Sequence, residues 1–176
     1  EEYKQTRVMF HQLNTAAEND RVVAAYGHSA SLPILETDFP SVWLSPRSSH
    51  AVLKVKHGDN NEISLFTAPR AELLSGDISW SQLCGESDQV TDFAVIGDTI
   101  YLVTGKQAPR FKLVEMSLND TDMASSRDVV PAGDLVIESV SVAADALYIS
   151  AKRDGIGMVM RWAPDVGLEE LSLIHI

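Results

Sequence analysis

Short strand-like runs of apolar residues, broken by turn residues, recur along the whole chain. The spacing of three and four that marks an amphipathic helix is not seen. One unit occurs twice, at residues 97–103 and residues 144–150, as a turn residue, an Asp and an apolar run around a Tyr. The two copies are about 47 residues apart, and a weaker copy at residues 48–55 lies about 49 residues before the first. A period of this length predicts stacked β units.

The runs fall into sets of four, each about one repeat long, which predicts the blades of a β-propeller. Turns at residues 58–61, 105–107 and 153–155 separate the second and third runs of successive sets, where hairpins require Gly, Asn or Asp for positive φ. We therefore predict an all-β partial β-propeller with about three to four four-stranded antiparallel blades. The expected runs are 6–13 and 21–26 in an incomplete first blade, then 41–45, 50–56, 62–68 and 78–84, then 90–95, 99–104, 111–117 and 127–130, and finally 135–142, 146–151, 157–162 and a run near Leu168.

Composition and charge narrow the function classes. Hydrophobic residues make up 45% of the chain and no apolar stretch is long enough to span a bilayer, so we expect a folded domain with no membrane partner. Lys and Arg total 14 against 25 Asp and Glu, and the net charge of −11 is spread along the chain. Because phosphate binding needs concentrated positive charge, no nucleic-acid partner is expected either.

Candidate catalytic and metal-binding groups are sparse. A serine-hydrolase nucleophile needs Gly-x-Ser-x-Gly, and the nearest match, residues 85–89, lacks the second Gly and precedes a strand rather than a helix. The single cysteine, Cys84, has no disulfide partner and no neighbouring base. The other groups considered are scattered or lack a ligand pattern, so we expect no catalytic residue, no metal site and no cofactor. These groups are His11, His28, His50, His57 and the acidic turn at residues 59–62.

Several functions stay open on the residues alone. β-Propellers host many activities, so a binding or scaffold module without catalysis is one interpretation. A propeller glycosidase would need two carboxylates about 5 to 10 Å apart, and no local spacing ties Glu115 to Glu138. Trp43, Trp80 and Trp162 fall on strands of different sets, where packing between blades explains them better than a ligand platform does.

Four short segments carry a family resemblance. Residues 10–15 are Phe-His-Gln-Leu-Asn-Thr, residues 44–47 are Leu-Ser-Pro-Arg, residues 104–113 run from a Thr through Ala-Pro to a Leu, and residues 129–131 are Val-Val-Pro. The first three are similar to the segments His-x-Leu-Gly-Thr, Leu-Ser-Pro-Asp-Gly and Thr-Asn-x-x-Ala-Pro-x-x-x-Leu of one family. The chain thus resembles the propeller domain of the prolyl oligopeptidase family of serine peptidases. It departs from the family at Asn14, which replaces a Gly, and after Pro46, where the Asp-Gly is missing.

This resemblance extends from about residue 3 to residue 164 and implies a fold and a function. It implies a seven-bladed propeller joined to an α/β-hydrolase domain of the same polypeptide, in a cytoplasmic or periplasmic enzyme. The hydrolase domain would cleave short peptides after proline, and the propeller would cover the active site and exclude large folded substrates. The chain would hold about three and a half blades, none of the catalytic residues and no cofactor.

The resemblance also implies two residues that face the substrate. In the family, an Arg at the end of this second strand faces the backbone side of the peptide, and a bulky apolar residue just before the first strand lines the same region. Lys56 and Phe39 occupy the matching positions. A Lys lacks the planar, bidentate donor geometry of an Arg. A surface Lys and a core Phe are the alternative interpretation.

Both ends of the chain indicate a piece of a longer gene. The chain begins with Glu1 rather than Met, and residues 171–176 are what one reading frame of a common sequencing adapter encodes. We therefore expect residues 1–170 to form the partial propeller domain and residues 171–176 to be read-through. A gene that continues through this point without adapter sequence would refute this expectation.

Overall fold

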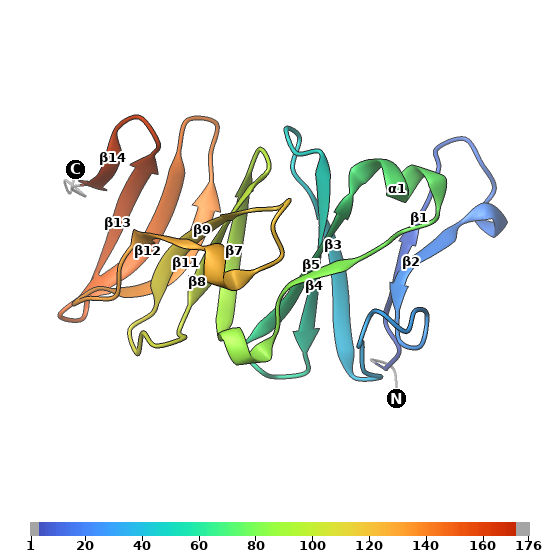
Figure 1. Ribbon diagram of the computed structural model, residues 1–176, viewed down its shortest axis with the longest axis horizontal. Coiled ribbons are helices and arrows are strands. Elements are labelled where there is room, and N and C mark those ends of the chain that lie inside the picture. Colours follow the sequence, from blue (N-terminus) through green and yellow to red (C-terminus); the bar gives the residue numbers. More distant parts are fainter. Residues whose placement is uncertain (1–3, 172–176) are drawn as a thin grey trace. The chain divides into compact units, whose positions relative to one another are not determined.

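Antiparallel β-sheets make up the fold (Figure 1), and the computed structural model describes residues 4–171. The chain divides into two compact units, Glu1–Glu86 and Ser87–Ile176, and each is described by itself. Of the expected read-through segment, Leu171 is the last residue of the final strand, whereas residues 172–176 lie outside the described residues, as does Glu1. Within residues 4–171 no helix has the length and apolar character needed to cross a membrane.

The first unit contains a two-stranded sheet followed by a four-stranded sheet, both antiparallel. In the four-stranded sheet the strands lie side by side in sequence order. Its third and fourth strands are joined by a short α-helix, which the sequence did not predict. The elements are β1 (Arg7–Phe10), β2 (Arg21–Ala25), β3 (Asp38–Leu44), β4 (His50–His57), β5 (Ile63–Pro69), α1 (Arg70–Ser75) and β6 (Ser81–Cys84), with a 3-10 turn, η1 (Ala17–Asn19), between β1 and β2.

The second unit contains two four-stranded antiparallel sheets, each again in sequence order. The elements are β7 (Val90–Ile96), β8 (Thr99–Thr104), β9 (Lys112–Ser117), β10 (Arg127–Val130), β11 (Val136–Val142), β12 (Leu147–Arg153), β13 (Ile156–Ala163) and β14 (Gly167–Leu171). A 3-10 turn, η3 (Met123–Ser125), joins β9 to β10, and another, η2 (Glu86–Asp88), lies between β6 and β7. The predicted all-β partial propeller is confirmed, with three complete four-stranded sheets and one two-stranded sheet.

Strand β3 begins earlier than the sequence predicted, at Asp38 rather than residue 41. Phe39 therefore lies inside this strand and not before it, which corrects the expected position. The Asp38 carboxylate stabilises the start of β3 because it accepts a hydrogen bond from the Leu35 N–H, at 2.8 Å. Pro40 has no N–H to donate, but β3 is an edge strand of its sheet, so a ladder bond is not lost.

Each unit has its own hydrophobic core between its two sheets. Trp80 is buried in the core of the first unit, and Trp162 packs against Tyr101 in the second, with ring centroids 5.1 Å apart. The packing interpretation thus holds for two of the three tryptophans. It does not hold for Trp43, which is 54% exposed and has the Lys54 Nζ 5.7 Å from its ring centroid.

Polar contacts join the two sheets within each unit. In the first unit the Trp80 Nε1–H donates to the Val23 carbonyl oxygen of the two-stranded sheet, at 3.3 Å. In the second unit the backbone N–H of Val140 on β11 donates to Asp92 Oδ2 on β7, at 2.9 Å. Hydrogen bonds between sheets both stabilise the packing and restrict how the two sheets are placed against each other.

The predicted hairpin turns form where positive φ is available. Gly58 has a φ of +51°, and Asp154 and Gly155 have φ values of +52° and +82°. In the turn at residues 105–107 the positive φ falls on Gln107, at +56°, and not on the Gly. The turn positions were therefore right, although one of the residues in the left-handed region was not the expected one.

Candidate functional site

The two residues singled out by resemblance, Phe39 and Lys56, are cross-strand partners on β3 and β4. Lys56 pairs in turn with Ile63 on β5, so the three residues form one row across the sheet. The Phe39 side chain is half-buried and the Lys56 side chain is exposed. The structure therefore brings an apolar ring and an exposed ammonium group together at one end of the sheet, and their contact with substrate stays a prediction.

Directly beside this pair is a group of three polar side chains, the buried Asp38 and Ser64 and the half-buried His57, which we call the Asp38 network. His57 Nδ1 lies 3.1 Å from Asp38 Oδ2, and His57 Nε2 lies 2.8 Å from Ser64 Oγ. Asp38 is 1% exposed and Ser64 is 6% exposed. The Nδ1–Oδ2 contact is close, but its geometry does not meet that of a hydrogen bond, and Nδ1 has no hydrogen-bond partner within residues 4–171.

The order of groups in the Asp38 network is that of a hydrolase triad, but its setting is not catalytic. Ser64 is the second residue of β5 and is buried. A nucleophilic serine needs an exposed position on a sharp strand-to-helix turn, and the oxyanion that it generates needs donors. We therefore assign the Asp38 network to the support of the fold around Phe39 and Lys56.

Sequence reasoning missed the Asp38 network, since it grouped His57 with the scattered histidines expected at the surface or at strand ends. The three members are separated along the chain and meet only because Asp38 and His57 are register partners. A buried Asp at the start of one strand and a His at the end of the next was the only available signal. That signal becomes informative once the hairpin register is known.

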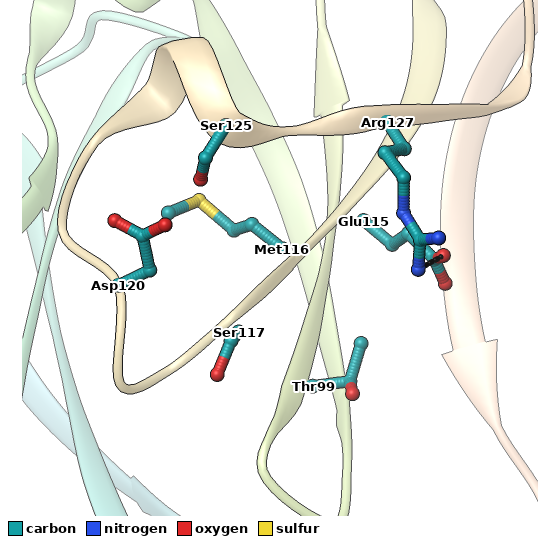
Figure 2. Close-up of a pocket in the computed structure, with 7 residues that line it drawn as sticks. All are labelled: Thr99, Glu115, Met116, Ser117, Asp120, Ser125 and Arg127. Carbon is teal, nitrogen blue, oxygen red and sulfur yellow. Dashed lines mark hydrogen bonds and ion pairs between the residues drawn. The ribbon is translucent and has the colours of Figure 1, made fainter.

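The second unit contains a cavity of about 280 Å³ between β8, β9 and the β9–β10 connection (Figure 2). Figure 2 shows the Arg127 guanidinium beside the Glu115 carboxylate at one side of this cavity, with Nη2 and Oε1 2.8 Å apart. The residues lining it are Thr99, Glu115, Met116, Ser117, Asp120, Ser125 and Arg127.

The carboxylates of this cavity are already bound by the protein. Asp120 Oδ1 accepts the Asp122 N–H at 3.0 Å, and this bond together with the Ser125 hydroxyl holds the Asp120 pKa below its usual value. Burial, followed by the charge and hydrogen bond of Glu115, raises the pKa of Tyr101 to about 12. These polar side chains thus stabilise the β9–β10 connection and the edge of the sheet, and they do not indicate a bound ligand. Across residues 4–171 no three His, Cys, Asp or Glu side chains are placed to hold a metal ion.

Comparison with known proteins gives one family and a set of solved structures. The family described as "Prolyl oligopeptidase, N-terminal beta-propeller domain" matches residues 1–167. No curated protein matches the chain. A solved prolyl endopeptidase, from work on inter-domain dynamics in catalysis and specificity, is 24% identical with a TM-score of 0.75, and the match covers 97% of this chain and 24% of that one.

Two structures of prolyl oligopeptidase B from Galerina marginata also match nearly the whole of this chain. The apo protein is 18% identical with a TM-score of 0.72, covering 97% of this chain and 24% of that chain. The same protein bound to a 35mer hydrolysis and macrocyclization substrate is 18% identical with a TM-score of 0.74, covering 97% and 23%. At these identities the likeness shows the fold. The chain spans about a quarter of the length of the solved proteins that it matches.

Proposed function

Because the chain belongs to the prolyl oligopeptidase N-terminal β-propeller domain family, we propose that it is the noncatalytic propeller part of a serine peptidase that hydrolyses short peptides after proline. The observation that carries the proposal is the family match over residues 1–167, on a chain whose four-stranded sheets follow one another as propeller blades do. The catalytic partner is an α/β-hydrolase domain of the same polypeptide.

The role of the propeller in this proposal is to control which substrates reach the active site. A ring of blades leaves a narrow channel and a rigid rim, so short unstructured peptides pass and folded proteins do not. Hydrogen bonds between sheets, such as the part-buried bond from Val140 N–H to Asp92 Oδ2, support this role because a size filter must not widen easily.

Phe39 and Lys56 supply the contact with the peptide. The half-buried ring of Phe39 offers an apolar surface, and the exposed Lys56 ammonium has three donors for backbone carbonyl oxygens. Their pairing in one register position supports a joint role. Since an ammonium cannot form the two parallel bonds of a guanidinium, Lys56 would form a single hydrogen bond with each peptide carbonyl oxygen that it contacts.

The complete gene and its product test the proposal. The gene is expected to encode a Gly-x-Ser-x-Gly segment downstream of Pro164, followed by an Asp and then a His. The product is expected to react with a serine-directed fluorophosphonate and to lose its hydrolytic activity on a chromogenic peptide with proline before the scissile bond. A stop codon soon after Pro164, or activity that resists the inhibitor, would contradict it and would favour a binding or scaffold module or another peptidase class.

A further inference from the structure

We infer that the Asp38 network positions the Phe39–Lys56 pair at the end of the sheet where the pair would contact a peptide. The peptide-contact part of this inference rests on the proposed function. The positioning part rests on the geometry of β3, β4 and β5 alone.

The Asp38 network joins three strands at one end of the sheet. Asp38 is the first residue of β3, His57 is the last residue of β4, and Ser64 is the second residue of β5. Asp38 also ties in the preceding chain, because its carboxylate accepts the Leu35 N–H and its carbonyl oxygen accepts the Thr6 hydroxyl at 2.6 Å. Movement of any one of these strand ends would break a buried polar contact.

The network and the pair lie on opposite faces of the same strand ends. Phe39 directly follows Asp38, and Lys56 directly precedes His57. Because successive side chains of a strand point to opposite faces, the backbone that carries the network also sets the direction of the Phe39 ring and of the Lys56 stem. A shift of the backbone at His57 would therefore also move the side chain of Lys56.

The other two complete sheets have a different arrangement at this place. The first residue of the first strand pairs as Asp38 with His57, as Val90 with Thr104, and as Val136 with Lys152. Neither of the later two pairs joins an Asp to a His, and the Thr104 hydroxyl donates to the backbone carbonyl oxygen of Asp88 at 2.6 Å. Strand β7 has a register shift directly after this pair and β11 has one after Ile137, whereas β3 keeps a regular register.

The Asp38 network is not required for a four-stranded sheet of this kind to form. Two sheets of the same chain form four strands without an Asp–His pair at this place. Buried polar groups are costly unless they are paired, so a sheet that needs only stability favours apolar residues here. The network occurs in the sheet that carries Phe39 and Lys56, where the strand end keeps a regular register.

The test compares two hydroxyl deletions on β5 in the 176-residue chain. Ser64→Ala removes the partner of His57 Nε2. Thr67→Val is the matched control, because the Thr67 hydroxyl is buried and has no hydrogen-bond partner within the described part of the chain. Asp38→Asn is a second test variant, which keeps the shape of the side chain and removes the charge that faces His57 Nδ1.

Nuclear magnetic resonance reads the positioning directly. Ser64→Ala and Asp38→Asn are expected to shift the ring nitrogens of His57 and the backbone amides of Phe39 and Lys56, and Thr67→Val is expected to leave these signals in place. Unchanged Phe39 and Lys56 signals in both test variants would overturn the inference, as would equal shifts in Thr67→Val.

Peptide affinity separates this inference from the proposed function. With a fluorescein-labelled hexapeptide that has a central proline, Ser64→Ala is expected to raise the Kd about three- to tenfold, as loss of one hydrogen bond does, and Thr67→Val to leave it unchanged. A wild-type chain that does not bind the peptide would count against the proposed contact, while the resonance shifts still decide the positioning. Peptide binding that is equally tight in Ser64→Ala would overturn the positioning of the contact.

Discussion

Arg21 and Gly76 lie so close together that a side chain at Gly76 would have to displace the Arg21 guanidinium: a Cβ at this position would be 2.0 Å from Arg21 Nη1. Gly76 ends α1 with a φ of +89°. Arg21, on β2, donates from Nη2 to the carbonyl oxygens of Leu73 and Leu74, at 2.8 and 3.0 Å. A single arginine of the two-stranded sheet therefore closes the C-terminal end of a helix that belongs to the four-stranded sheet.

Gly76→Ala is expected to lower the free energy of unfolding by about 2 to 4 kcal/mol, because the positive φ and the displaced Arg21 both contribute. Gly27→Ala is the matched control, since Gly27 has a φ of +67° and no atom within 4 Å of an added Cβ. The control is expected to cost about 1 kcal/mol from φ alone. Urea denaturation measures both, and equal losses would contradict the close contact.

Asp92 is expected to hold the first strands of the two sheets of the second unit together. Asp92→Ala removes the acceptor of the Val140 N–H, which leaves a half-buried donor unpaired and should cost about 1 to 3 kcal/mol. Asp92→Asn keeps an acceptor oxygen and should cost less. Hydrogen exchange at the Val140 amide reports the bond itself. Exchange that is no faster in Asp92→Ala than in the natural chain would show that the bond contributes nothing.

Tyr101 is expected to make the chain less stable at high pH. Its folded pKa of about 12 lies above the ordinary tyrosine pKa of 10.0, so between these values the unfolded chain loses a proton that the folded chain keeps. The stabilisation is fully present below pH 10 and is lost as the pH rises toward 12. Absorbance titration at high pH measures this ionisation, and Tyr101→Phe should remove a step near pH 12. Loss of a step near pH 10 instead would contradict the assignment.

Much of the fold could be predicted because its signals are local. The Asp98 and Asp145 units mark the hairpins at β8 and β12, and the turn residues mark most of the connections. The early start of β3 was missed because Pro40 reads as a break, although an edge strand tolerates it. Helix α1 was missed because six residues are too few to show a helical period.

The candidate site was predicted only in part, for a different reason. Resemblance named Phe39 and Lys56, and the register shows that they are partners. The Asp38 network depends on which residues face each other across two hairpins, and no spacing along the chain encodes that. Trp43 was misjudged because a tryptophan on a strand reads as core, whereas this one is exposed at the end of an edge strand.

Lys56 is expected to contribute to substrate binding more than to turnover. In the complete gene product, Lys56→Met should raise KM about three- to tenfold with little change in kcat, because a contact made equally in the ground state and the transition state is lost. Lys56→Arg, which restores a bidentate donor, should lower KM below that of the natural protein. Lys152→Met, on the exposed surface of β12, is the control and should change neither constant. A KM that is the same for Met, Arg and Lys at position 56 would remove this residue from the site.

The selectivity of the complete gene product for short peptides over folded proteins tests the central claim most directly. The substrates are a short peptide with one internal proline and a stably folded protein that carries the same segment in an exposed loop, with products identified by mass spectrometry. The account predicts cleavage after proline in the short peptide and no cleavage in the folded protein. Cleavage of both at similar rates, or no cleavage after proline in the short peptide, would contradict it.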